Sequence, residues 1–303
     1  MARVLVCCGL ATLDVMQTVE RVPRADEKVV AAGASVTFGG PAANAAATAV
    51  ALGVPALLAT RVGGSPAGAL VAAGLSAAGV DLLDVAGPDD VPPVSTVLVT
   101  AATGERAVAS TNATRAGETA RAAGTAEDPD VAQRLAGLAA PSRWREGDVL
   151  LLDGHHHDLA LLLARVARGR GSTVLLDGGS WKPGTPELLG LCDVVVLSAD
   201  FRVPGEPADR TVRAVAGLGP RFVARSAGPG PIEVLSEGRE RAVEVPRARR
   251  VVDTLGAGDV LHGACAAALV GGATPLAALR SAARTATGSV EHAGARGWIA
   301  ARR

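Results

Sequence analysis

Short apolar runs alternate with segments of helical periodicity over most of the chain. The run Val4–Gly9 is apolar and ends at a glycine, which is typical of a buried parallel strand. Beyond residue 148 the alternation is regular, with strands expected at 149–152, 173–176 and 194–197 and a helix expected at 158–168. This order predicts an α/β fold in which helices flank a doubly wound, mostly parallel sheet, and the carboxyl ends of the strands share one rim.

Two other stretches, 15–38 and 94–110, show the period-two alternation of half-buried strands. The first is divided by the polar segment Pro23–Asp26 and the second by a turn that contains Gly104, so each predicts a pair of antiparallel strands. We expect the two pairs to form a small antiparallel sheet over the rim. This small sheet and the main sheet would together make one domain over residues 1–303, with a loose connection at 116–129.

A helix of small residues is expected to begin directly after Gly39-Gly40. Small residues allow the backbone to approach a ligand closely, and the Asn44 side chain both donates and accepts hydrogen bonds, which suits a polyol. Asp14 follows the first strand, at the rim where ligands of open α/β sheets bind. Taken alone, these features are also typical of an ordinary turn and an ordinary helix start.

The most specific pattern lies in the segment Val251–Gly263. Here a turn of Gly256, Ala257 and Gly258 precedes an apolar helix, and the N–H groups at such a helix start carry partial positive charge that suits a phosphate. Asp259 stands beside this turn, where its carboxylate would repel a bound phosphate. It therefore either caps the helix or accepts a proton from a hydroxyl that attacks a phosphoryl group.

Asp-Thr-Leu-Gly-Ala-Gly-Asp at 253–259 resembles the C-terminal signature of the ribokinase-like (PfkB) carbohydrate kinases, and Gly-Gly-Pro-Ala-Ala-Asn at 39–44 resembles their N-terminal signature. The resemblance covers nearly the whole chain and implies an ATP-dependent kinase that phosphorylates a sugar hydroxyl. It also implies that the sheet of 15–38 and 94–110 is a small antiparallel β lid over the site and the interface of a homodimer. It implies that Asp259 is the base and that the N–H groups of Gly256, Ala257 and Gly258 stabilise the transferred phosphoryl group. The sugar contacts that it implies are Asp14, Gly39, Gly40, Asn44 and Asn112. Asn112 is equally consistent with an ordinary polar loop residue.

The same resemblance implies ATP and Mg²⁺ as cofactors. It places Asp253 where the family helps to hold a monovalent cation, so activation by K⁺ is an expectation. The nucleotide contacts that it implies are Ser198, Arg225, Gly228 and Gly230.

Two segments depart from the family pattern. Ser198-Ala199-Asp200-Phe201 stands where many members have Asn-x-x-Glu, which leaves Asp200 as a weak substitute for the Glu. Arg225 and Ala227 stand where a Thr and a Gly are usual, although a guanidinium offers donors that would pair with phosphate. These departures leave open a sugar-binding pseudokinase or sensor, whereas the carboxylate at 259 argues for catalysis.

The motifs look most like those of bacterial ketose kinases, including kinases of fructose or its sulfonated analogue. The Ser-x-Asp form at 198–200 resembles ketohexokinases and favours the same reading, in which a hydroxymethyl group of a ketose-like sugar is phosphorylated. A ribokinase or nucleoside kinase is the alternative. Pro41, where ribokinases often have Lys, argues against a ribokinase.

Composition excludes several other classes of partner. Thirty basic and 30 acidic residues cancel, and aromatic residues make up only 2% with no Tyr, so neither an electrostatic footprint for nucleic acid nor a base-stacking platform is expected. Hydrophobic residues reach 49%, but no uninterrupted apolar run has membrane-spanning length, and the N-terminus shows no signal peptide pattern. We expect a cytoplasmic protein that binds small molecules and does not bind membranes.

Cysteine and histidine spacing gives little support for a metal site. The four cysteines lack metal-ligand spacing. Cys7 and Cys8 fall in an apolar strand and Cys265 in an apolar helix, so small buried side chains are expected. In the run His155–His157, adjacent side chains on an extended segment point in opposite directions, so at most two could share a metal. A rim loop that contacts substrate and plain exposure are the other interpretations.

Overall fold

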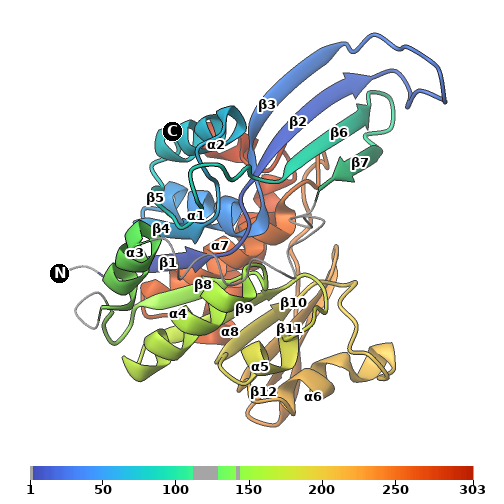
Figure 1. Ribbon diagram of the computed structural model, residues 1–303. Helices are drawn as coiled ribbons and strands as arrows, with labels where there is room; N and C mark the ends of the chain where they lie inside the picture. The colour runs from blue at the N-terminus through green and yellow to red at the C-terminus, as the bar shows by residue number, and fades with distance from the viewer. Residues whose placement is uncertain (1–2, 112–128, 141–143, 303) are drawn as a thin grey trace.

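The computed structural model describes residues 3–111, 129–140 and 144–302. Within these residues, nine strands form one sheet in the order β13-β12-β11-β10-β9-β8-β1-β4-β5 (Figure 1). The strands are β1 (Leu5–Cys8), β4 (Ala56–Thr60), β5 (Asp81–Asp84), β8 (Val149–Leu152), β9 (Thr173–Gly178), β10 (Val194–Leu197), β11 (Phe222–Ala227), β12 (Gly230–Ser236) and β13 (Arg239–Val243). Pairing is parallel from β11 through to β5, and β12 and β13 are antiparallel.

Helices cover both faces of this sheet. Leu5 and Cys7 of β1 belong to one hydrophobic core, and Val6 and Cys8 belong to the other, as the alternation of side chains along a strand requires. The first core is covered by α1 (Pro41–Ala51), α2 (Pro66–Ala77), α7 (Ala257–Val270) and α8 (Pro275–Ser289). The second is covered by α3 (Pro129–Ala139), α4 (His157–Gly169), α5 (Thr185–Leu189) and α6 (Thr211–Ala216). The short helix α9 (Gly297–Ala300) follows α8.

The carboxyl ends of β1 and β8 meet where the strand order reverses direction. From β1 the chain first adds β4 and β5 on one side, and later adds β8, β9, β10 and β11 on the other. Ligands of open α/β sheets bind outside such a switch point. Asp153, directly after β8, lies there and accepts hydrogen bonds from Leu10 N at 2.8 Å and Ala42 N at 3.2 Å. Its carboxylate thus ties the end of β1 to the start of α1.

The two helices that carry the signature motifs pack closely together. Alanine forms most of the buried face of α1, and Gly263 of α7 faces the backbone of Ala45 and the side chain of Thr48. A Cβ atom at position 263 would collide with that backbone, so glycine permits the close approach. Residues from the start of α1 and the start of α7 therefore come within hydrogen-bonding distance.

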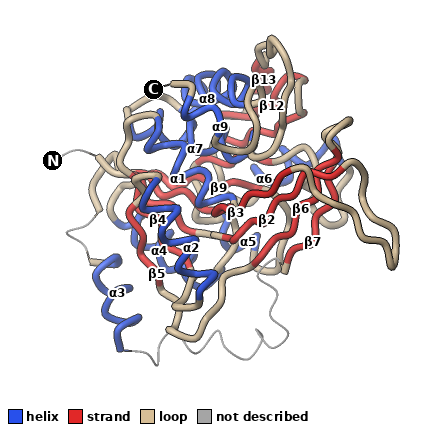
Figure 2. Tube along the Cα trace, turned by 90° about the horizontal axis from the view of Figure 1, so that it is seen from above, coloured by secondary structure: helices blue, strands red, loops and turns tan. Residues whose placement is uncertain are grey.

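A second sheet, the lid sheet, projects from the body (Figure 1), and the view from above shows it reaching out on the side away from α3 (Figure 2). Its strand order is β3-β2-β6-β7, formed by β2 (Thr12–Val19), β3 (Gly33–Gly39), β6 (Val94–Thr100) and β7 (Arg106–Ser110). The pairs β2–β3 and β6–β7 are antiparallel, as expected, but β2 and β6 are parallel. The lid sheet is therefore mixed, because β2 and β6 both leave the main body in the same direction.

Asn112 and the segment 116–129, apart from Pro129, lie outside the described residues. All four cysteines are buried and unpaired, which confirms the expectation from their apolar surroundings. Over the described ranges, none of the helices combines the length and apolarity needed to span a bilayer.

Candidate active site

The turn before α7 has the geometry expected for an anion-binding helix start. Gly256 adopts a left-handed conformation with φ 71° at the N-cap of α7, and a side chain there would also collide with Ala295. Glycine meets both requirements. The first N–H groups of a helix lack intrahelical partners, so those around Gly256, Ala257 and Gly258 form the positive end of α7. Asp259 lies in the first turn of the same helix.

Asp259 is held by a residue from the other signature motif. Asn44 Nδ2 donates to Asp259 Oδ2 at 2.7 Å, across 215 positions of the chain. Burial first, and then the charge of Asp177, raise the pKa of Asp259 to about 7, whereas the Asn44 hydrogen bond and the charge of His262 act to lower it. A carboxylate with a pKa near neutrality is suited to accept a proton at neutral pH.

A buried ion pair, formed by His262 and Asp177, lies close to Asp259. His262 Nδ1 lies 3.1 Å from Asp177 Oδ2, and Nε2 lies 3.0 Å from the carbonyl oxygen of Val196. Burial alone would lower the pKa of His262, but the Asp177 charge and hydrogen bond, the Val196 carbonyl and Asp259 together raise it to about 9. The imidazole is therefore charged at neutral pH, and it places a positive charge one helical turn from Asp259.

The predicted sugar contacts gather at the junction between the lid sheet and α1. Asp14 lies within β2 rather than just past a strand of the main sheet, and Thr12 Oγ1 donates to its Oδ1 at 2.7 Å. Gly39 pairs with Thr12 in the lid sheet, and a side chain at 39 would collide with the Asp14 carboxylate. Gly40 is the N-cap residue of α1, and Asn44 is buried within the same helix. The structure thus brings together four of the five predicted contacts, and Asn112 lies outside the described residues.

Arg296, just before α9, lies in the same site and was not predicted from the sequence. Its guanidinium donates to Asn44 Oδ1, and also to Thr37 Oγ1 and to the Phe38 carbonyl oxygen, both at 2.6 Å. It also stacks on the Phe38 ring, 3.7 Å from the ring centroid. Burial lowers the pKa of Arg296 to about 10, while Asp14 and Asp259 act to raise it. No periodicity or motif marks this residue, because its partners lie more than 250 positions earlier.

The predicted nucleotide contacts lie together at the carboxyl ends of β10 and β11. Leu197 and Arg225 are register partners, so Ser198 follows β10 beside Arg225. The Arg225 guanidinium donates to the carbonyl oxygens of Ala208 and Ala199 at 2.7 and 2.8 Å, and Ser198 Oγ donates to Gly179 O at 2.9 Å. Residues 228–229 form the turn of the β11–β12 hairpin, with Gly228 at φ 58°, and Gly230 is the first residue of β12, where it pairs with Ala227. These contacts show Arg225 holding two loop carbonyls; its role toward a phosphate stays a prediction.

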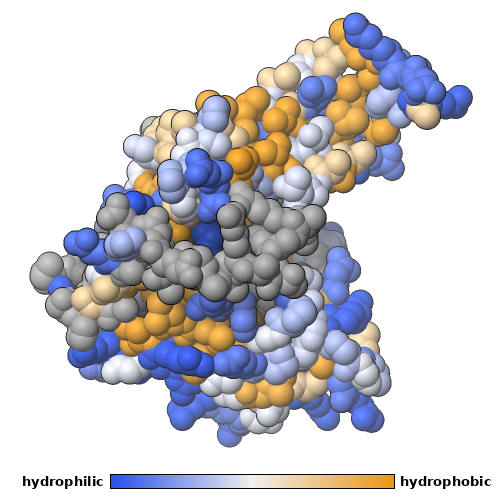
Figure 3. All heavy atoms as spheres, in the orientation of Figure 1, coloured by the Kyte–Doolittle hydropathy of each residue, from blue (hydrophilic) through white to orange (hydrophobic). Residues whose placement is uncertain are grey.

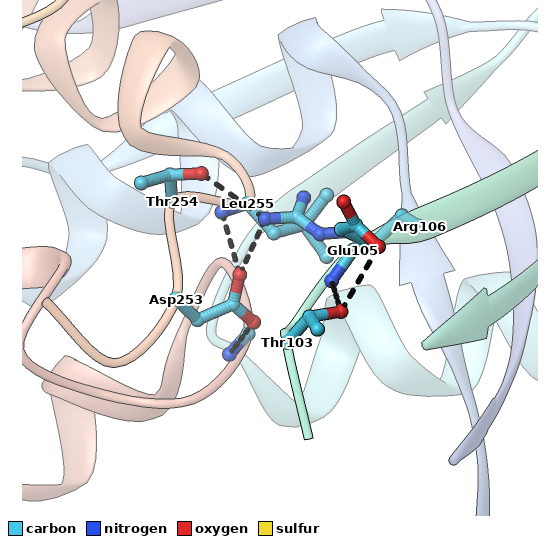
Figure 4. A network of polar contacts seen from close by, with 7 residues as sticks. Thr103, Glu105, Arg106, Asp253, Thr254 and Leu255 are labelled. Atoms are coloured by element: carbon cyan, nitrogen blue, oxygen red, sulfur yellow. Dashed lines mark hydrogen bonds and ion pairs between the residues drawn. The ribbon is translucent and has the colours of Figure 1, made fainter. Parts of the chain in front are cut away.

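Asp253 is engaged by the lid sheet. Arg106 Nη2, from β7, lies 2.7 Å from Asp253 Oδ1 and 3.1 Å from Thr254 Oγ1, and Figure 4 shows the guanidinium reaching between these two side chains. Leu255 N also donates to Oδ1 at 2.9 Å, and Gly294 N donates to Oδ2 at 2.8 Å. Both carboxylate oxygens are therefore occupied by donors, and an arginine balances the negative charge.

Histidines 155–157 make protein contacts at the rim. His156 Nδ1 lies 3.4 Å from Arg61 Nη1, and burial lowers the pKa of His156 to about 4. His157 Nε2 lies 3.8 Å from Glu187 Oε2. Among the residues that the structure describes, no group of three or more His, Cys, Asp or Glu side chains is arranged to hold a metal ion.

Comparisons with known proteins identify the family and the fold. The model of the pfkB family of carbohydrate kinases matches residues 2–300. A ribokinase from Arabidopsis thaliana is 28% identical over 303 residues, covering 96% of this chain and 77% of the relative. The solved structure of Arabidopsis thaliana ribokinase complexed with ribose and ATP superposes with a TM-score of 0.75 at 23% identity, covering 97% and 94% of the two chains. A phosphofructokinase-2 variant from Escherichia coli superposes with a TM-score of 0.75 at 16% identity over 100% of both chains.

Proposed function

This chain belongs to the pfkB family of carbohydrate kinases, and from that premise we propose that it transfers the γ-phosphoryl group of ATP to a hydroxymethyl group of a ketose-like sugar. The observation that carries the proposal is the Asp259 carboxylate, whose pKa is raised to about 7 beside the positive end of α7. A protein that only bound sugar would gain nothing from a proton acceptor at this place.

In the proposed reaction, the oxygen of the sugar hydroxyl attacks the γ-phosphorus, its proton passes to the Asp259 carboxylate, and the bond to ADP breaks. The N–H groups of Gly256, Ala257 and Gly258 would stabilise the charge on the transferred phosphoryl oxygens. A hydrogen bond from Asn44 occupies Asp259 Oδ2, so Oδ1 is the oxygen left to receive the proton.

The acceptor sugar would lie between the lid sheet and α1. Asp14 would accept hydrogen bonds from sugar hydroxyls, and Gly39 and Gly40 would let the backbone approach the sugar ring. Asn44, in the first turns of α1, would also hydrogen-bond the sugar. Asn112 stays a prediction, since it lies outside the described residues.

ATP would lie along the carboxyl ends of β10 and β11, near Ser198, Arg225, Gly228 and Gly230. Mg²⁺ would enter with the nucleotide, and it would neutralise negative charge on the phosphate oxygens during transfer. Asp200 is exposed at this rim. It would contact Mg²⁺ through a water molecule. Since ATP is the phosphoryl donor, we place the protein in the cytoplasm.

Three donors contact the Asp253 carboxylate, including the Arg106 guanidinium at 2.7 Å, and they take up three of its roughly four acceptor sites. Arg106 also balances the negative charge that would attract a cation. Activation by K⁺ through Asp253 stays a prediction, and we assign no step to it.

Ribose is the alternative acceptor, and the ribokinase relative at 28% identity favours it. Ribose also presents a hydroxymethyl group, so the same base and anion-binding turn would serve. The two acceptors differ in the hydroxyls that meet Asp14 and the lid sheet.

We also propose that the chain forms a homodimer through the lid sheet. Strands β3 and β7 are the edges of this sheet, and Val36 and Val108 on them are 54% and 60% exposed. Figure 3 shows apolar side chains along the lid between its polar distal end and the body. Exposed edges and apolar side chains of this kind need cover.

A panel of sugars tests the substrate proposal. ADP release would be followed with ATP and a series of ketoses, ribose and nucleosides, with Asp259→Asn as the matched blank, and the phosphorylated carbon would be identified by NMR. We expect the highest kcat/KM with a ketose, at its terminal hydroxymethyl group. Preference for ribose would establish the alternative acceptor, and ADP release that no sugar stimulates would contradict both.

A further inference from the structure

Arg296 is the one cation of the described residues that hydrogen-bonds the side chain holding the base. Its guanidinium donates to Asn44 Oδ1 in α1 and to Thr37 Oγ1 and Phe38 O in β3. All three acceptors are uncharged oxygens. The guanidinium is thus held by two separate elements, and it is further confined against the face of the Phe38 ring.

This arrangement determines which way the Asn44 amide points. A guanidinium can only donate hydrogen bonds, so the amide must turn its oxygen toward Arg296. The amide nitrogen then faces Asp259 Oδ2, at 2.7 Å. The flipped amide would set its oxygen against a carboxylate oxygen and its NH₂ group against the guanidinium, and both contacts would be repulsive.

The charges around Asp259 make this orientation consequential. Asp177 from β9 and Asp153 after β8 both disfavour a second negative charge, and His262 of α7 opposes them. Arg296 adds a second positive charge, since it interacts electrostatically with both Asp14 and Asp259. One hydrogen bond, from Asn44, and two cations, His262 and Arg296, therefore favour the ionised form of Asp259. Arg296 orients the hydrogen bond and is also one of the two cations.

We propose that Arg296 is a positioning residue for the proton acceptor: it holds the Asn44 amide in the orientation that donates to Asp259, and so keeps that carboxylate ionised with one oxygen directed to the acceptor hydroxyl. The inference rests on the proposed role of Asp259 as the base. Arg296 itself makes no transfer of a proton or a phosphoryl group.

The test compares Arg296→Met and Arg296→Lys with Arg280→Met, an exposed arginine on α8 whose loss changes the net charge equally. For Arg296→Met we expect kcat at pH 7 to fall about 10-fold or more, the usual scale for losing a hydrogen bond to a charged group. The acid limb of kcat should move up by about one pH unit, so the deficit shrinks at pH 9, and the KM for sugar should change less than kcat. Arg296→Lys keeps the positive charge but loses the planar set of guanidinium N–H donors. We therefore expect its acid limb of kcat to move in the same direction by a smaller amount. Arg280→Met should match the wild type.

A double-mutant cycle with Asn44→Ala supplies the decisive comparison. Because Arg296 acts largely through Asn44, Arg296→Met should cost clearly less activity in the Asn44→Ala background than in the wild type, and only the part due to its own charge should remain. Additive losses, or an acid limb that stays in place, would overturn the inference. Should the Met variant fail to fold, as thermal unfolding would show, the Lys variant carries the same test, and its unchanged pH profile would overturn the inference. An active Asp259→Asn protein would instead overturn the base assignment itself, so the two failures are distinguishable.

Discussion

At the scale of single residues, Asp259 is defined by neighbours that pull its proton affinity in opposite directions. Burial and two carboxylates favour the protonated form, whereas Asn44, His262 and Arg296 favour the ionised form. The balance leaves the pKa of Asp259 at about 7, well above the ordinary value of 3.8 for an aspartate carboxyl group. A much higher pKa would leave the carboxyl group protonated at neutral pH, and a much lower pKa would make it too weakly basic to assist proton transfer.

The first prediction follows from this balance. Because the base must be ionised to accept a proton, kcat/KM for sugar should be low at pH 5 and rise through an apparent pKa near 7. Initial rates measured from pH 5 to 9 at saturating ATP provide the check. An acid limb that falls entirely below pH 5 would mean that the base is not the carboxylate described here.

The Asp177–His262 pair gives a second prediction, which concerns stability. The pKa of His262 is raised above its unfolded value of 6.5, so the pair contributes its full stability below pH 6.5 and loses it as the pH rises through about 9. Chemical denaturation at pH 6.5 and 9.5 should therefore show a lower free energy of unfolding at the higher pH. In His262→Gln the difference should shrink. The same pH dependence in both proteins would contradict the assigned charge state.

At the scale of elements, local sequence patterns predicted those strands whose structure depends on residues that are neighbours in the sequence. The apolar runs at 149–152 and 194–197 coincide with β8 and β10, because short runs buried on both faces are bounded by polar residues. The parallel pairing of β2 with β6 was not predictable, because about 80 residues separate Leu13 from its partner Val94. Asp14 lies within β2 and not in a loop after β1, because only three residues separate the two strands.

The same distinction holds for the site. Both glycine turns and Asp259 were found from their motifs, which are local. Arg296, the Asp177–His262 pair and Arg106 were not found, because each acts through a residue 85 to 252 positions away, and no short pattern encodes such a contact.

The third prediction concerns the contact between the lid sheet and the body. Arg106 links β7 to the segment that leads into the anion-binding turn, and its side chain is only 22% exposed. Arg106→Met should raise the KM for sugar about fivefold, as expected from losing about 1 kcal/mol of a partly buried ion pair. Amide hydrogen exchange in β6 and β7 should become faster.

Arg21→Met is the matched control, because Arg21 pairs with Glu27 within the lid and does not reach the body. Its KM for sugar should stay at the wild-type value. Equal effects of the two substitutions would show that the contact with Asp253 has no special role.

At the scale of the whole molecule, the lid sheet extends from the body with both of its edges open, and it contributes Asp14 and Thr37 to the site (Figures 1 and 2). If a second subunit covers the lid sheet, dimer formation also helps to close the sugar site. Closure matters because water that reached the phosphoryl group would compete with the sugar as acceptor.

The fourth prediction follows from this arrangement. Light scattering should report twice the chain mass of 30.2 kDa, and hydrogen exchange in residues 15–38 should slow when sugar is added. Replacing Val36 and Val108 together by lysine should produce a monomer with a higher KM for sugar. Leu162→Lys, at a site on α4 that is 38% exposed, should stay dimeric. A monomeric wild type would remove the proposed interface and leave the kinase assignment intact.

The central claim is that Asp259 accepts the proton of the sugar hydroxyl, and Asp259→Asn tests it most directly. Asn keeps the size of the side chain and an oxygen that accepts the Asn44 hydrogen bond, but it cannot take up the proton. With the best sugar, we expect kcat to fall about 100-fold or more, the usual scale for a lost general base, while the Kd for sugar and the thermal unfolding midpoint stay close to the wild type. A variant that folds, binds sugar and keeps most of its kcat would contradict the account.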